Sequence, residues 1–183
     1  MKEVLFGAYE ARRSVKKTNT LVLVEKAIDV PALHARGVGC CAAMAHREIS
    51  QALLEKHYAQ CENIVFCFAA ARVKEPIFMQ AVHAGLSILV EGRDCAFAIL
   101  PSKYRHCTGF IEDLGIEAFY QLIESAPGVV DTICRDIRGT KKQKDAGDTL
   151  KEIRTETLKS LSTIPSTLYR RIAIQRLDEL LGS

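Results

Sequence analysis

The sequence contains no uncharged apolar run of 18 or more residues, and its first four residues do not pair a positive segment with an apolar block. These absences argue against a membrane span and a secretory signal, so we expect a cytoplasmic protein with no membrane partner. There is also no C-x-x-C and no H-x-x-x-H spacing. The seven cysteines lie mostly inside apolar runs. They are therefore expected to be reduced core residues, and no zinc site is predicted.

The chain has little excess charge, only +3 over 183 residues. That balance alone does not indicate a nucleic-acid-binding protein. The basic residues nevertheless gather in three clusters: Arg12, Arg13, Lys16 and Lys17; Arg135, Arg138, Lys141, Lys142 and Lys144; and Arg170, Arg171 and Arg176. If the three clusters converged on one surface, they would favour contact with phosphates.

Short β-rich runs alternate with helical patterns between residues 20 and 100, which is typical of βαβ units. The expected strands are 20–24, 38–43, 63–68 and 95–100, with helices at 29–36, 46–60 and 74–89. After residue 115 the pattern predicts helices only, at 116–124, 129–138, 148–161 and 166–181, with a polar linker at 139–147.

These elements predict an α/β fold with a mostly parallel four-stranded sheet flanked by helices, followed by a C-terminal helical subdomain. The 48% apolar content suffices for a well-buried core. We divide the chain into an N-terminal helical lead-in at 1–19, an α/β domain at 20–114 and a helical subdomain at 115–183.

A candidate site lies where ligands bind in open α/β sheets, beyond the carboxyl ends of the strands. Glu25 follows the first predicted strand, and Asp29 comes four residues later. Ala69 and Ala71 occupy the corresponding end of the third strand. A Mg²⁺ site needs converging oxygen ligands, and alanine methyl groups supply none.

Five segments in order along the chain resemble the TOPRIM catalytic domain of bacterial DNA primases of the DnaG type and the helical region that follows it. The segments are residues 5–12, 23–33, 64–72, 97–101 and 115–119. The resemblance covers nearly the whole chain. It implies a TOPRIM-like fold.

The resemblance implies a set of acidic residues that hold metal and nucleoside triphosphate in that family. The set consists of a glutamate, an aspartate four residues on, an Asp-x-Asp and a later Asp-Pro-Asp. Glu25 and Asp29 match the first two positions. The Asp-x-Asp falls on Ala69 and Ala71, and the glycine after the family's glutamate is Lys26 here.

The last acidic motif falls in residues 102–106, a neutral to basic segment that contains Lys103 and Arg105. We therefore expect a pseudoenzyme that binds no metal or other cofactor and makes no primer. Glu25 and Asp29 are at most weak metal candidates. Glu25 would instead keep a structural hydrogen bond, and Asp29 would cap the helix that follows it.

The function that these features predict is binding, as a decoy or regulator of DNA replication of the kind carried by a phage or mobile element. The expected partners are single-stranded nucleic acid and replisome proteins such as primase and the replicative helicase. The expected contact residues are Arg12, Arg13, Lys16, Lys17, Arg72, Lys103 and Arg105.

Two alternatives stay open. One is a Mg²⁺-dependent TOPRIM nuclease or nucleotidyl transferase with a site rewired from Glu25, Asp29, Glu91, Asp94, Glu112 and Asp113. The other is a nucleotide-sensing module that binds a phosphorylated ligand through Arg72, Lys103 and Arg105. Glu91 and Gly92 spell a family motif, but we interpret them as a tight turn before the fourth strand.

Overall fold

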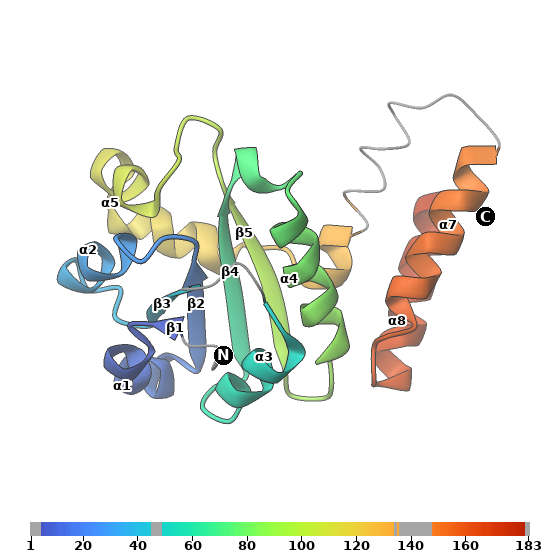
Figure 1. The fold of residues 1–183 in the computed structure, drawn as a ribbon, viewed down its shortest axis with the longest axis horizontal. Helices are drawn as coiled ribbons and strands as arrows, with labels where there is room; N and C mark the ends of the chain where they lie inside the picture. The colour runs from blue at the N-terminus through green and yellow to red at the C-terminus, as the bar shows by residue number, and fades with distance from the viewer. Residues whose placement is uncertain (1–4, 45–48, 134, 136–147, 182–183) are drawn as a thin grey trace.

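The computed structural model describes residues 5–44, 49–133, 135 and 148–181. A five-stranded sheet lies at its centre, with strand order β1-β3-β2-β4-β5 (Figure 1). β2 pairs in parallel with β3 and β4, and β5 pairs in parallel with β4. The strands are β1 (Leu5–Phe6), β2 (Thr20–Val24), β3 (Cys41–Met44), β4 (Asn63–Ala69) and β5 (Asp94–Leu100). The predicted mostly parallel sheet is confirmed.

The prediction of four strands is wrong, because β1 adds a fifth. β1 pairs antiparallel with β3, with Leu5 opposite Met44. A strand of two residues is too short to show an alternating pattern in the sequence. By pairing with β3 it covers an edge that would otherwise expose unpaired backbone groups.

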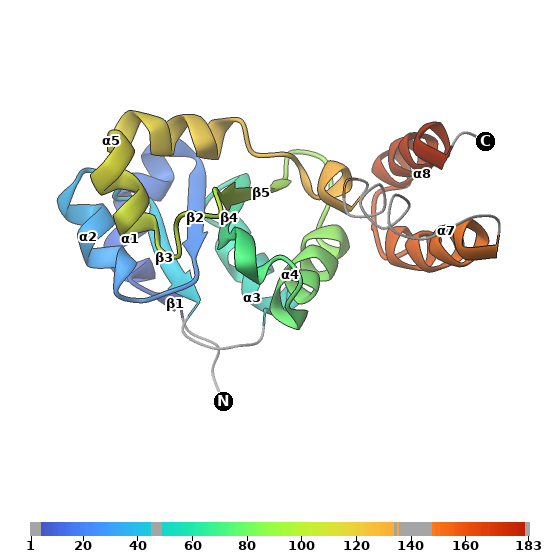
Figure 2. The same ribbon diagram turned by 90° about the horizontal axis from the view of Figure 1, so that it is seen from above.

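Helices cover both faces of the sheet. α3 (Gln51–Tyr58) and α4 (Pro76–Ser87) lie on one side, and α5 (Cys107–Glu124) lies on the other (Figure 2). α1 (Ala8–Thr18) packs against β2 and β3, and α2 (Asp29–Ala35) packs against β3 and α5. The two-layer covering explains why the strands are nearly continuous apolar runs.

The last two helices, α7 (Asp148–Leu161) and α8 (Thr167–Leu181), pack against each other at one end of the molecule (Figure 1). α7 also contacts α4. Ser166 precedes α8, and its Oγ accepts a hydrogen bond from the backbone N of Tyr169 at 3.4 Å, as expected of an N-cap. Leu161, Ile164, Ala173 and Leu177 are buried in or beside this helix pair.

The largest differences from the expected helices are at their ends. α3 begins at Gln51, where Ser50 Oγ accepts from Leu53 N at 3.1 Å, so the predicted start at 46 is too early; residues 45–48 themselves lie outside the described part. α5 begins nine residues before the predicted 116, and Gly115 breaks it with φ 83 and ψ 172. The predicted linker 139–147 lies outside the described residues. The division of the chain into three segments stays a prediction.

The core is built around phenylalanines of β4, β5 and α4. The ring centroids of Phe66 and Phe97 lie 5.1 Å apart, and the Phe78 ring meets the Phe97 ring edge-on at 5.4 Å. Phe66, Phe68 and Phe97 have no exposed surface. Adjacent parallel strands place these rings side by side, which fixes the position of the carboxyl ends of β4 and β5. No helix in the described part of the chain is long and apolar enough to cross a membrane.

The six described cysteines are buried and free, as predicted. Burial raises the pKa of the Cys61 thiol to about 11 and that of Cys41 to about 12. At pH 8 such thiols are almost wholly protonated, and only the thiolate reacts with disulfide reagents.

We expect these thiols to react with Ellman's reagent at pH 8 at least about a hundredfold more slowly in the native protein than after denaturation. Absorbance at 412 nm, with and without guanidinium chloride, measures the two rates. Rapid native reaction of several thiols would contradict the buried placement.

Candidate functional site

Glu25 and the segment after β4 lie side by side at the carboxyl edge of the sheet, as predicted. β2 and β4 are parallel neighbours, with Val24 opposite Cys67. Glu25 Oε2 accepts a hydrogen bond from the backbone N of Ala69 at 2.8 Å, and Glu25 Oε1 accepts from Arg72 Nε at 2.7 Å. Arg72 also pairs with Glu75 at 2.7 Å. The Glu25 carboxylate therefore ties the end of β2 to the short 3-10 turn η1 (Ala70–Arg72).

Asp29 does not cap the following helix, and that prediction is wrong. It lies inside the first turn of α2, whose N-cap is Ile28 without a side-chain hydrogen bond. Its Oδ1 instead accepts from the backbone N of Thr108 at 3.2 Å and from Thr108 Oγ1 at 2.7 Å. Asp29 is only 2% exposed. It therefore caps the beginning of α5 across the interface between α2 and α5.

The residues at this edge do not fit a Mg²⁺ ion. Both carboxylate oxygens of Glu25 accept hydrogen bonds, and the buried Asp29 carboxylate accepts one from the Thr108 hydroxyl. Ala69 and Ala71 carry no oxygen ligand in their side chains, and Mg²⁺ requires near-octahedral oxygen coordination. Among the described residues, no group of three or more His, Cys, Asp or Glu side chains could hold a metal ion.

The other acids proposed for a rewired site are not brought together. Glu91 and Asp94 lie at the beginning of β5, at the opposite edge of the sheet from Glu25, and Gly92 with φ 77 confirms the turn there. Glu112 pairs with Arg36 at 3.0 Å. Lys103 pairs with Asp113 at 2.7 Å, which lowers the pKa of that carboxyl and raises the pKa of the lysine.

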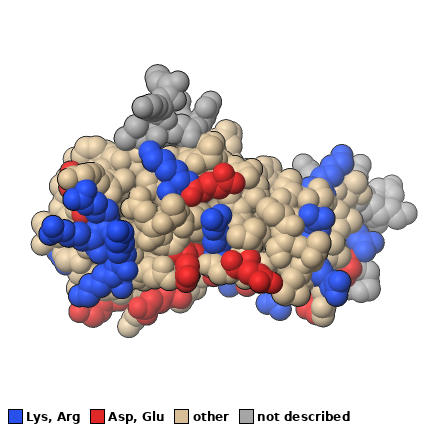
Figure 3. Space-filling model, turned by 90° about the horizontal axis from the view of Figure 1, so that it is seen from below, with Lys and Arg blue, Asp and Glu red and all other residues tan. Residues whose placement is uncertain are grey.

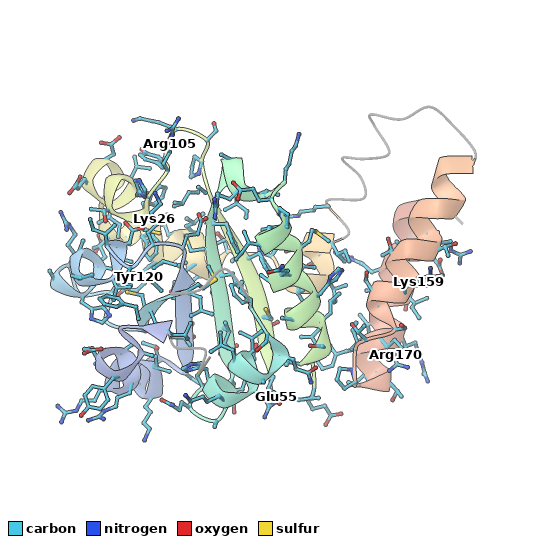
Figure 4. All side chains as sticks on the ribbon, viewed as in Figure 1. Lys26, Glu55, Arg105, Tyr120, Lys159 and Arg170 are labelled. Atoms are coloured by element: carbon cyan, nitrogen blue, oxygen red, sulfur yellow. The ribbon has the colours of Figure 1, made fainter. Side chains whose placement is uncertain are left out.

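Lys26, directly after Glu25, and Arg105, in the loop between β5 and α5, lie at the carboxyl edge without an ion pair to any described residue. The same holds for Lys74, which follows η1. Lys26 Nζ lies 3.5 Å from Nε2 of His106, the residue after Arg105. Figure 4 shows Arg105 near the top of the molecule and Lys26 below it on the same side, from two different loops. The buried Nδ1 of His106 has no hydrogen-bond partner among the described residues.

Lys26 is a site residue that the sequence reasoning did not select. The signal was present, because Lys26 replaces the glycine that the family motif places after its glutamate. An added cation beside the strand end raises the local potential. Of the other predicted contacts at this edge, Arg72 and Lys103 are already paired with acids.

Of the three basic clusters, the first and the third lie at opposite ends of the molecule. Arg12, Arg13, Lys16 and Lys17 are exposed on α1, and Figure 3 shows a continuous basic patch at the end of the molecule where α1 lies. Arg170, Arg171 and Arg176 lie on α8, at the other end. Arg170 donates to the Ile164 carbonyl and Arg176 pairs with Asp131. Apart from exposed Arg135, the middle cluster lies outside the described residues.

The chain is similar in sequence to bacterial DNA primases. It is 23% identical over 178 residues to the DNA primase of Pseudomonas putida, covering 97% of this chain and 27% of that protein. It is 27% identical over 97 residues to the DNA primase of Pseudomonas aeruginosa, covering 53% of this chain and 15% of that protein. The chain thus spans about a quarter or less of the length of these relatives. No family model matches it.

Solved primase structures share its fold. The DnaG catalytic core has a TM-score of 0.86 at 24% identity, covering 98% of this chain and 57% of that one. A DNA primase domain from Pseudomonas aeruginosa has a TM-score of 0.86 at 23% identity, covering 99% and 56%. A DnaG primase catalytic domain bound to ssDNA has a TM-score of 0.85 at 23% identity, covering 97% and 56%. The resemblance to DnaG-type primases and the TOPRIM-like α/β fold are confirmed.

The expectation that the chain is not an enzyme is overturned by these relatives. The proteins that match it over nearly its whole length are DNA primases, which are enzymes. The expectation rested on the side chains at Ala69, Ala71 and the 102–106 loop. The similarity to these enzymes extends over 97% of this chain and 27% of the Pseudomonas putida protein.

Proposed function

We propose that the chain takes part in DNA replication as a primase-related unit that binds single-stranded nucleic acid at the carboxyl edge of its sheet. The similarity to DNA primases supports replication as the process. A solved neighbour of the same fold is a primase catalytic domain bound to ssDNA, which supports the ligand. The proposal includes a regulatory role, in which the chain occupies a strand that primase and the replicative helicase also use.

The observation that carries the proposal is the pair of unpaired cations, Lys26 and Arg105, at the edge where open α/β sheets bind ligands. The pairing of Glu25 with Arg72 removes a negative charge from the same edge. Glu75, Glu112 and Asp113 are also paired. A surface whose described acids are paired in this way and that carries unpaired cations attracts phosphate groups.

The test is the charge-reversal pair Lys26→Glu and Arg105→Glu. Fluorescence anisotropy with a labelled 20-nucleotide oligothymidine measures the affinity. We expect roughly a tenfold loss at 50 mM salt, and a log–log salt slope shallower by about 1.4 because two phosphate contacts are lost.

The matched control is Lys159→Glu with Arg171→Glu, which changes the charge equally on the exposed surface of α7 and α8, at the far end of the molecule. This control pair is expected to change the affinity less than about threefold. An equal loss of affinity in the two pairs would contradict binding at the carboxyl edge.

We also expect the wild-type chain to bind Mg²⁺ only weakly, with a dissociation constant above about 1 mM, because its oxygen ligands are few and engaged. Replacing Arg72 by Gln frees Glu25, and adding Ala71→Asp supplies a second exposed carboxylate, so this double variant should bind Mg²⁺ more tightly. Calorimetric titration with Mg²⁺ distinguishes the two proteins. Micromolar binding by the wild type would show that the engaged carboxylates do coordinate metal.

A further inference from the structure

One face of α1 gathers almost every charged side chain of that helix. Ala11 and Val15 are buried against the sheet, whereas Arg12, Arg13, Lys16 and Lys17 are exposed. At 100° per residue, the four cations span an arc of about 140° on the side away from the core. Gly7, with φ 81, turns the chain from β1 into α1 at the start of this helix.

The net charge of the protein resides on this face. α1 contains four cations and one acid, Glu10, so its net charge equals the +3 of the whole chain. None of the four cations has an ion pair with a residue in the described ranges, in contrast to Arg36, Arg72, Lys103 and Arg176. The α1 face is therefore positive and free to bind an anionic polymer.

An exposed aromatic ring lies within the same arc. Tyr9 is 70% exposed. The guanidinium carbon of Arg12 lies 3.9 Å from the centroid of the Tyr9 ring, which is the geometry of a cation–π contact. A large exposed ring among unpaired cations has no role in the packing of α1, because the buried face of the helix is Ala11 and Val15.

We propose that the exposed face of α1 is a second contact site for single-stranded nucleic acid, with Arg12, Arg13, Lys16 and Lys17 on successive phosphates and Tyr9 stacked on a base. Cations that follow the backbone combined with an aromatic stacking surface are the features that bind single strands without sequence preference. A duplex keeps its bases stacked inside, so Tyr9 distinguishes single strands from duplexes. The inference rests on the proposed function and adds the exposed face of α1 to the contact surface.

The experiment uses the full chain and the labelled oligothymidine at 50 mM salt. The pair Arg12→Glu and Lys16→Glu is expected to lower the affinity at least about tenfold, against less than threefold for the control pair Lys159→Glu and Arg171→Glu. Tyr9→Ala is expected to lower it about fivefold or more, and Tyr9→Phe less than twofold, because the ring and not the hydroxyl stacks. On an abasic strand of equal length, Tyr9→Ala should have no effect.

The outcomes separate this inference from the proposed function. If the α1 pair and the control pair lose equally while Lys26→Glu with Arg105→Glu loses more, the α1 site is overturned and the edge site stands. If the α1 pair lowers the affinity and Lys26→Glu with Arg105→Glu does not, the edge site is overturned and the α1 site stands. Equal affinity of the wild type for single strand and duplex overturns the role of Tyr9. No binding by the wild type overturns both. Thermal melting followed by circular dichroism confirms that each variant folds.

Discussion

Replacing Phe97 by alanine should destabilise the protein by about 3–5 kcal/mol. Phe97 is fully buried on β5, and its ring contacts Phe66 of the neighbouring strand and Phe78 of α4. The variant loses the transfer free energy of the ring and leaves a cavity that rigid neighbours on two layers fill only in part. Because domains are stable by only about 5–15 kcal/mol, the loss is a large share of the total.

Urea unfolding followed by circular dichroism measures this effect. With a typical dependence of about 1–3 kcal/mol/M, we expect the midpoint of Phe97→Ala to fall by more than about 1 M. Phe6→Ala is the control, since Phe6 is 47% exposed on the edge strand β1. Its midpoint should change much less. Similar shifts for the two variants would contradict the central position of Phe97.

Replacing Asp29 by alanine should destabilise the protein by about 2–3 kcal/mol. The carboxylate holds the backbone N and the hydroxyl of Thr108, and it is the contact by which α2 caps α5. Its removal leaves the two Thr108 donors without that acceptor at a half-buried position. Asp29→Asn keeps an oxygen at the same place and should cost less than about half as much.

The two variants separate a structural role of Asp29 from a metal-binding role. A carboxylate whose role is to bind metal lowers the free energy of unfolding when no metal is bound. Its removal would therefore stabilise the chain in EDTA. The geometry predicts the opposite sign. Urea unfolding in EDTA that shows Asp29→Ala to be as stable as the wild type, or more so, would contradict the structural role and return Asp29 to the metal candidates.

The fold was largely predictable because its strands are long, buried and bounded by clear breaks. The runs that became β4 and β5 sit between helices on both faces, and their apolar composition reflects that burial. β1 was missed because a strand of two residues is too short to show an alternating pattern of apolar and polar residues. The early start of α5 was missed because Gly109 interrupts its apolar pattern. The Asp29 cap and packing on the sheet stabilise a helix from Cys107 despite Gly109, whereas Gly115 does break the helix.

The candidate site was only partly predictable. Parallel pairing of β2 and β4 follows from the βαβ pattern, so the meeting of Glu25 with residues 69–72 could be foreseen. The partner of each charge could not, because side chains far apart in sequence decide it. Asp29 and Thr108 are 79 residues apart. The clustering of basic residues along the sequence likewise did not predict that the clusters on α1 and α8 lie at opposite ends of the molecule.

The measurement that tests the account most directly is the salt dependence of oligothymidine binding by the wild-type chain. With four to six phosphate contacts, the log–log slope should be about −3 to −4, so that the affinity falls by about 50- to 300-fold between 50 and 200 mM salt. No detectable binding at 50 mM salt, or an affinity that does not change with salt, would contradict the claim that this primase-related chain acts on single-stranded nucleic acid through its unpaired cations.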